Sequence, residues 1–208
     1  KNDFLNGKGT YLSRNGCKSE GIFKDHDLHG EGKVTCEDGF YSEGTYKKDI
    51  LNGEGKIIFA NGTKYIGLFK DGDLNGKGRI EWNNGSIEFG NFINDELNGK
   101  GTYLYDNGKK YVGDFVDGIR LGKGTFTWPN GDRYEGDFVN GKLSGKGTYL
   151  YDNGKKYVGD FVDGEFNGKG TYTSESGNKY VGNFLDGDKS GYGVFTWSEG
   201  EKYIGKWK

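Results

Sequence analysis

The sequence predicts an all-β protein, an elongated single-layer twisted antiparallel β-meander (a rod-like solenoid) built from 23-residue hairpins. The first reason is a 23-residue period that runs through all 208 residues without insertion or deletion. The second is that all 41 glycines lie in five columns of this period. The third is that aromatic or glycine residues alternate with other residues inside each repeat, which is the side-chain period of a β-strand.

The composition limits the core and the partners that the chain offers. Hydrophobic residues make up 32% of the chain, aromatic residues 16%, and methionine is absent, so rings rather than aliphatic side chains dominate the apolar content. The formal net charge of −2 gives no general attraction to nucleic acid, and no run approaches the ~18 apolar residues of a membrane span. We therefore expect a cytoplasmic protein with no nucleic-acid partner.

Each repeat is expected to form one hairpin, as in the stretch KYVGDFVDGIRLGKGTFTW. Asp117 to Arg120 supply its turn, and Asn-Gly steps such as Asn107-Gly108 join one repeat to the next, because these residues tolerate positive φ. The alternation places the rings and glycines of both strands on one face: Tyr111, Gly113, Phe115, Gly122, Gly124, Phe126 and Trp128.

Matching these faces predicts the register of the hairpin. Tyr111 lies opposite Phe126, Gly113 opposite Gly124, and Phe115 opposite Gly122, so rings lie over bare backbone. On the reverse face, the same register predicts three ion pairs, each worth only ~0.2–1 kcal/mol when exposed: Asp114 with Lys123, Asp137 with Lys146, and Asp160 with Lys169.

The pattern resembles the MORN repeat (membrane occupation and recognition nexus), whose core is Y-x-G-x-[FYW], a short turn, G-x-G and a further glycine. YVGDFVDG followed by GKGTF matches it closely, and the resemblance covers the whole chain. The expected domain is one continuous array at 1–208: a half unit at 1–18, eight full units at 19–202 and a half unit at 203–208. Ser19, Ser42 and Glu88 depart from the pattern, because they stand where the family prefers Tyr.

Two chemical motifs compete with the repeat interpretation. Asp71, Asp73 and Asn75 copy the start of an EF-hand calcium loop, but Trp82 occupies the twelfth position, where a bidentate Glu is needed. Zinc ligation is the other, and its candidate residues are the only cysteines and histidines: Cys17, His26, His29 and Cys36. The hairpin separates the histidines at its turn from the cysteines at its base, so we expect no metal and no cofactor. Cys17 faces Cys36, which permits a disulfide, but in an intracellular protein we expect reduced thiols.

We expect no enzyme and no small-molecule substrate, because no nucleophile, base and orienting group recur together. The ring columns form the core of the sheet, and rings left exposed would bind protein partners. The predicted partner-binding face consists of Tyr111, Phe115, Tyr134, Phe138, Tyr157, Phe161, Tyr180 and Phe184. A homodimer through the carboxy-terminal end is predicted from three further rings, Trp197, Tyr203 and Trp207.

Two classes of function remain open. The resemblance implies a scaffold at the membrane-associated cytoskeleton, most like the repeat-only MORN proteins of apicomplexan or other protist cells. The alternative is a membrane-recruiting or regulatory segment of a larger enzyme such as a phosphoinositide kinase. In that case the anionic headgroups of membrane lipids would contact a column of lysines: Lys110, Lys156, Lys179 and Lys202.

Overall fold

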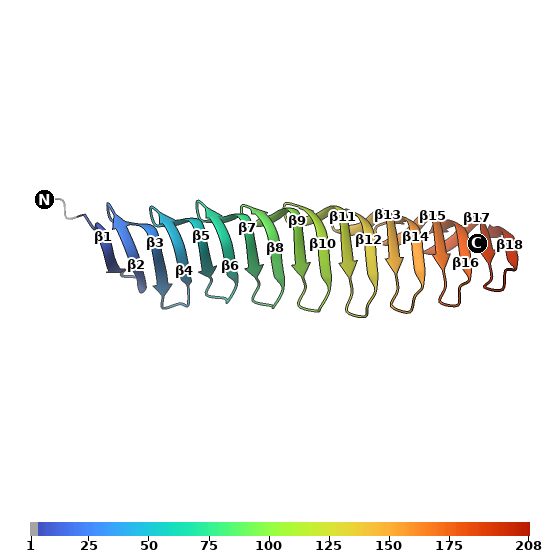
Figure 1. Cartoon of the computed structure of the whole chain (residues 1–208), viewed down its shortest axis with the longest axis horizontal. Helices are drawn as coiled ribbons and strands as arrows, with labels where there is room; N and C mark the ends of the chain where they lie inside the picture. The colour runs from blue at the N-terminus through green and yellow to red at the C-terminus, as the bar shows by residue number, and fades with distance from the viewer. Residues whose placement is uncertain (1–3) are drawn as a thin grey trace. The chain divides into compact units, whose positions relative to one another are not determined.

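The computed structural model describes residues 4–208, and within them every element is a β-strand (Figure 1). The strands group into two compact units, residues up to Asp106 and residues from Asn107 onward. In each unit every strand pairs antiparallel with the next one along the chain, in a single layer. The predicted all-β hairpin meander is thus confirmed, and the 23-residue repeat continues through both units.

The first unit holds β1 to β9, with these bounds: Gly7–Leu12, Cys17–Lys24, Asp27–Cys36, Tyr41–Lys47, Ile50–Ile58, Lys64–Lys70, Asp73–Glu81, Ile87–Ile93 and Glu96–Leu104. The second unit holds β10 to β18: Lys110–Val116, Ile119–Thr127, Arg133–Val139, Lys142–Leu150, Lys156–Val162, Glu165–Thr173, Lys179–Leu185, Asp188–Thr196 and Lys202–Trp207.

Two kinds of turn alternate along the chain. The turn inside a repeat has two residues with positive φ, as at Asp117 (47°) and Gly118 (70°), which is the hairpin geometry that suits the right-handed twist of strands. Arg120, predicted to be in this turn, already belongs to β11. Between repeats, an asparagine side chain accepts the amide of the residue two positions later, for example Lys109 N–H to Asn107 Oδ1 at 3.2 Å.

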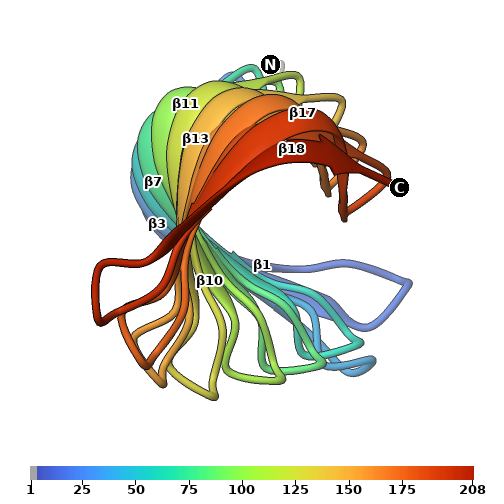
Figure 2. The ribbon, with the colours of Figure 1, turned by 90° about the vertical axis from the view of Figure 1, so that its right-hand side faces the viewer.

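The observed register agrees with the prediction near the centre of each hairpin and differs beyond it. Tyr111 faces Phe126 and Gly113 faces Gly124, as expected. Beyond this pair the register shifts, so that Phe115 faces Arg120 rather than Gly122. The second strand carries two extra residues there, and the same β-bulge recurs in the other repeats. Bulges bend strands, and β17 and β18 are visibly bent in Figure 2.

The bend brings the rings of one strand together. Tyr157 and Phe161 are four residues apart, which is ~13 Å along a straight strand, yet their ring centroids are 5.1 Å apart and edge-on. Tyr157 also meets Phe184 of the next repeat at 4.9 Å. Because the same two contacts recur in each repeat of the second unit, a continuous ladder of edge-on rings fills the inside of the bend.

Tyrosine, rather than phenylalanine, suits this ladder because of the bulge. The Tyr157 hydroxyl donates to the carbonyl of Asp160 at 2.9 Å, and the corresponding tyrosines repeat this bond to the residue three positions later. Burial raises the pKa of Tyr157 to about 12, so the hydroxyl keeps its proton and stays a donor. The ring lies over Gly170, where an added Cβ would come within 2.5 Å of Tyr157 Cε2.

The first unit packs its glycines differently, and this explains the three departures from the family pattern. Leucines of the second strands, not tyrosines of the first, lie over the glycines there: Leu74 is fully buried, and its methyl groups are 2.9 Å from an added Cβ at Gly78. Four leucines of one column share this role, Leu28, Leu51, Leu74 and Leu97. Ser19, Ser42 and Glu88 can therefore replace Tyr without leaving a void.

The predicted ion pairs within a hairpin are wrong in their partners. The bulge places Asp137 opposite Ser144 and Asp160 opposite Asn167, and it removes Lys123 from the strand position opposite Asp114. The lysines pair instead with the next repeat: Lys123 Nζ lies 2.7 Å from Asp137, and Lys146 Nζ lies 3.0 Å from Asp160. These charges therefore link neighbouring repeats rather than the strands of one repeat.

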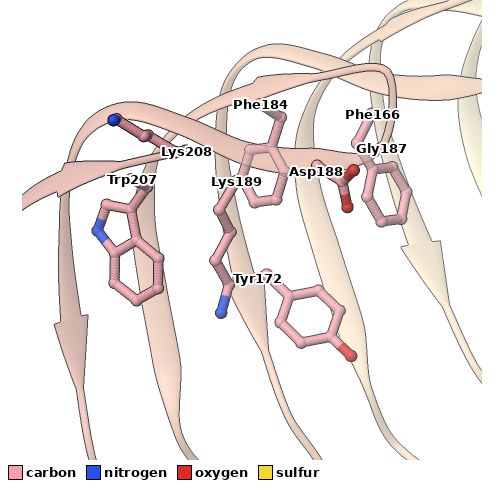
Figure 3. A pocket seen from close by; sticks show the side chains of 8 residues that line it. All are labelled: Phe166, Tyr172, Phe184, Gly187, Asp188, Lys189, Trp207 and Lys208. Carbon is pink, nitrogen blue, oxygen red and sulfur yellow. The ribbon is translucent and has the colours of Figure 1, made fainter.

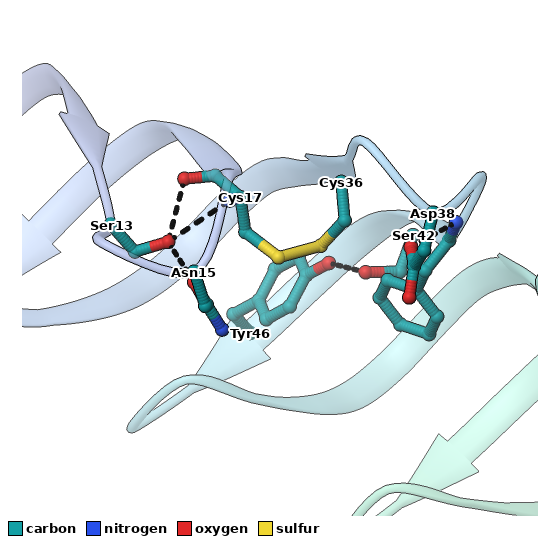
Figure 4. Close-up of a disulfide and its surroundings, with 8 residues drawn as sticks. Ser13, Asn15, Cys17, Cys36, Asp38, Ser42 and Tyr46 are labelled. Carbon is teal, nitrogen blue, oxygen red and sulfur yellow. Dashed lines mark hydrogen bonds between the residues drawn. A yellow bond between two sulfur atoms is a disulfide. The ribbon is translucent and has the colours of Figure 1, made fainter.

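The expectation of reduced thiols is also wrong. Cys17 on β2 and Cys36 on β3 occupy directly opposite positions and form a disulfide (Figure 4). Ser13 Oγ accepts the amide of Cys17 at 3.0 Å beside this crosslink. The disulfide closes the base of the first full repeat, where the Tyr column is replaced by serine.

Candidate binding surfaces

The eight rings predicted to bind partners are core residues. Their side chains are only 0–4% exposed, because the ring ladder and the glycines cover them: Tyr111, Phe115, Tyr134, Phe138, Tyr157, Phe161, Tyr180 and Phe184. They supply the packing of the second unit and present no exposed strip. Aromatic surface that a partner could reach must come from other columns.

A second row of rings lies on the same face of the second unit and is only half-buried. Its members come from the second strands and from the turns after them: Trp128, Tyr149, Tyr151 and Tyr172. Trp128 and Tyr149 lie 5.1 Å apart, and Tyr149 and Tyr151 lie 4.6 Å apart. We call these four residues the aromatic row. The sequence signal for them was present, since they stand in the Phe126 and Trp128 columns, but sequence reasoning did not select them.

Two cations stand beside this row, and sequence reasoning missed both. The Arg120 guanidinium lies 5.3 Å from the Phe126 ring centre and 5.7 Å from that of Tyr111. Lys189 Nζ lies 4.7 Å from Phe195 and 4.9 Å from Trp207. Burial lowers the pKa of Lys189, since rings surround its amine and none of the hydrogen bonds or ion pairs found in residues 4–208 involves it. The sequence did contain a signal for both cations, because the equivalent position of every other full repeat is leucine or phenylalanine.

Each cation borders a hollow in the surface. The Lys189 hollow has a volume of about 560 Å³, and the lysine extends between Trp207 and Tyr172 (Figure 3). The Arg120 hollow, of about 220 Å³, is lined by Phe126, Trp128 and Leu143. Each hollow is also bordered by one aspartate and one lysine: Asp188 and Lys208 at the first, and Asp163 and Lys142 at the second. Lys142 Nζ lies 3.3 Å from Asp163, and this ion pair leaves Arg120 as the positive charge of the second hollow.

The predicted lipid-contacting lysines lie on the other face of the sheet. All four are exposed and occupy the first residue of alternate strands: Lys110, Lys156, Lys179 and Lys202. Arg133 fills the remaining place in the column, and its guanidinium pairs with Glu135 at 2.7 Å. The column therefore presents a row of five cations with one partly neutralised.

The three rings predicted to mediate dimerisation differ in exposure. Trp197 and Tyr203 are 41% and 43% exposed, whereas Trp207 is half-buried against Tyr180 at 5.1 Å. The indole N–H of Trp207 is buried without a hydrogen-bond partner in the described residues. Trp207 thus belongs partly to the ring ladder, and the self-association role of all three stays a prediction.

The cysteine and histidine residues do not form a metal site in the part of the chain that the structure describes. The cysteines are bonded to each other, and His26 lies at the hairpin turn, where its ring is 4.9 Å from Phe4. The stretch that copies the start of an EF-hand calcium loop is a turn: Asp71 has a φ of 52°, and its carboxylate accepts the Asn52 side-chain amide at 3.1 Å.

Nine segments of the sequence match the MORN repeat: 1–18, 20–40, 43–64, 65–87, 89–110, 111–133, 134–156, 157–179 and 180–202. The chain belongs to the MORN repeat family. The matched MORN segments extend through both structural units. None of the curated proteins matches this MORN chain. No helix among residues 4–208 is long and apolar enough to cross a membrane.

Among solved structures, the MORN chain is similar to three domains of CPAP proteins. The TCP domain of SAS-4 (dCPAP) of Drosophila melanogaster, solved with a proline-rich motif of Ana2, is 16% identical, with 85% of this chain and 90% of that chain covered and a TM-score of 0.47. The CPAP G-box domain is 12% identical over 97% and 100% of the two chains, with a TM-score of 0.44. The TCP10 domain of Danio rerio CPAP is 13% identical over 96% and 100%, with a TM-score of 0.29.

Proposed function

We propose that this MORN array is a non-catalytic scaffold that binds protein partners along the ring-bearing face of its second unit. The aromatic row carries the proposal. The ladder of buried rings already completes the core, yet Trp128, Tyr149, Tyr151 and Tyr172 leave further ring surface half-exposed beside it. Aromatic residues that are not needed for packing are typical of interface centres. The repeat offers the same surface several times, as a scaffold requires.

Affinity capture with the purified chain tests the scaffold proposal. We expect saturable binding of defined protein partners, and we expect Tyr172→Glu to abolish it, because a carboxylate would be desolvated in the contact. Tyr192→Glu is the matched control, since Tyr192 is 74% exposed and lies on the opposite face. Capture that is absent, or that both variants leave unchanged, would contradict a scaffold role for this face.

A membrane-recruiting function, as in the repeat segment of a larger enzyme such as a lipid kinase, is the second candidate. The exposed lysine column on the opposite face supports it. If anionic lipid is bound there, the chain should sediment with vesicles containing phosphatidylserine, and binding should weaken with salt. The double variant Lys156→Ser/Lys179→Ser should lose this binding. Sedimentation that is insensitive to salt and to both substitutions argues against this candidate.

The cellular setting that we propose for the scaffold is the cytoskeleton or the membrane periphery, of the type found in apicomplexan or other protist cells. A homodimer through Trp197, Tyr203 and Trp207 is proposed as a second contact. Light scattering on a chain that lacks residues 198–208 tests it, because a dimer that survives the deletion unchanged cannot use this end.

A further inference from the structure

One column of the ring-bearing face runs across the second unit in the order cation, apolar, apolar, cation. Register places its members opposite the buried phenylalanines, so all of them lie on the face of the ring ladder: Arg120, Leu143, Phe166 and Lys189. Each of the four is half-buried, and they sit beside the aromatic row. A ligand lying across the strands would meet these four side chains in turn.

The spacing of this column defines the conformation of such a ligand. Successive members are two strands apart, which is ~9.5 Å at the usual strand separation. A polyproline II helix has three residues per turn and a rise of ~3.1 Å per residue, hence ~9.3 Å per turn. Every third residue of such a helix would therefore stay aligned with the column over three repeats. An extended β-strand has a period of two residues and cannot keep this alignment.

The charges define the ends of the ligand. Arg120 and Lys189 contact rings, and no carboxylate is paired with either of them in the described residues. Half-buried cations without an anion favour an acidic partner group, which would form a charge-assisted hydrogen bond in a partly dry site. The hollows beside both cations leave room for that group.

We propose that the ring-bearing face of the second unit binds an acidic, proline-rich segment in the polyproline II conformation, with acidic residues nine positions apart at Arg120 and Lys189 and apolar residues at Leu143 and Phe166. The aromatic row forms the wall against which the proline rings pack, which is how such helices are generally recognised. This inference rests on the proposed scaffold function and names the chemistry of the partner.

A synthetic peptide tests the inference directly: Glu-Pro-Pro-Leu-Pro-Pro-Leu-Pro-Pro-Glu, labelled for fluorescence anisotropy and titrated with the full chain. We expect saturable binding. A peptide with both Glu replaced by Lys should not bind. A peptide of the same composition with the second Glu moved to position eight should bind at least tenfold more weakly, because one charge-assisted hydrogen bond is lost.

Protein variants localise the contact. Arg120→Leu and Lys189→Leu should each weaken binding about tenfold, and both should fold, because leucine occupies this column in other repeats, as at Leu74 and Leu143. Lys169→Leu on the opposite face is the matched control for the change in charge, since Lys169 is exposed, and it should leave the affinity unchanged. Circular dichroism confirms that the variants retain their sheet.

Failure of the peptide to bind, equal binding of the Lys peptide, or equal affinities of the two column variants and the control would each overturn the inference. Replacing all prolines with glycine should weaken binding, and an unchanged affinity would overturn the polyproline geometry. The scaffold proposal fails separately: it depends on capture of any protein through Tyr172, so captured partners without peptide binding would reject only the acidic proline-rich ligand.

Discussion

At the scale of single residues, the second unit depends on glycines that leave room for rings. Tyr157 is fully buried over Gly170, and its hydroxyl donates a hydrogen bond to the carbonyl of Asp160 at the bulge. Position 170 must therefore lack a side chain for a steric reason, because its φ is an ordinary one for any residue. The same reasoning applies to the equivalent glycines under Tyr111, Tyr134 and Tyr180.

Gly170→Ala should consequently destabilise the second unit. The added Cβ would lie 2.5 Å from the Tyr157 ring, and overpacking of this kind costs ~1–3 kcal/mol. Gly9→Ala is the matched control: its φ is also ordinary, but the nearest atom, in Phe23, is 3.8 Å away. We expect that change to be neutral or slightly stabilising. Urea denaturation gives the free energy of unfolding, and equal losses in the two variants would refute the ring-over-glycine explanation.

Glu88 leads to a pH prediction. Burial raises its pKa, although the Trp82 indole N–H, 2.8 Å away, acts in the opposite direction. A carboxyl group whose pKa is higher in the folded state favours folding when protonated, and this contribution is lost as the pH rises through the folded pKa. Glu88→Gln keeps an oxygen for Trp82 without a charge. It should therefore stabilise the first unit at pH 7 but not at pH 4, whereas the exposed Glu96→Gln should show no such difference.

At the scale of the hairpin, the bulge determines which charges meet. The sequence pattern was sufficient to predict the strands, their faces and the Tyr111–Phe126 and Gly113–Gly124 pairs. It could not reveal the bulge, because two extra residues change the register without breaking the period of two. The errors beyond the glycine pair follow from this shift: the unshifted register assigns Lys146 to Asp137, and it places Arg120 in the turn instead of on the ring-bearing face opposite Phe115.

A double-mutant cycle tests the corrected pairing. Lys146→Ala and Asp160→Ala should show a coupling of ~0.2–1 kcal/mol, as is usual for exposed ion pairs. The corresponding cycle for Lys169 and Asp160, the pair expected from an unshifted hairpin, should show no coupling between the side chains. A larger coupling in the second cycle would restore the original register.

The disulfide of the first full repeat is the second element-scale feature. It closes a loop with a sequence separation of 19, so reduction should lower the stability of the first unit by ~2–4 kcal/mol. Hydrogen exchange with and without a phosphine reductant measures this, and the loss of protection should centre on β2 and β3. Cys17→Ser/Cys36→Ser provides the control, because the reductant should have no further effect on it.

At the scale of the whole molecule, the two compact units correspond to two ways of covering the same glycine columns. Leucines of the second strands cover them in the first unit, and tyrosines of the first strands cover them in the second. The sequence contains both the tyrosine and the leucine column, but it does not show which of them covers the glycines in a given repeat. The repeat with Tyr65 is an example: it keeps the tyrosine of the family pattern, yet Leu74 covers Gly78. The proposed binding surface depends on this difference. Where tyrosine covers the glycines, the positions of the leucine column are not needed for that packing and can hold Arg120, Phe166 and Lys189.

Tyr157→Ala should therefore act locally. Removing a fully buried ring of the ladder should cost about 3 kcal/mol or more, chiefly through the cavity left over Gly170. Repeat arrays couple nearest neighbours, so protection should fall in β14 and β15, then in β13 and β16, with β3 to β7 unchanged. Tyr157→Phe should cost only ~1 kcal/mol, because it loses one hydrogen bond and keeps the ring. Hydrogen exchange resolved by strand distinguishes the outcomes: a uniform loss from β2 to β18 would show that the repeats unfold as a single cooperative body.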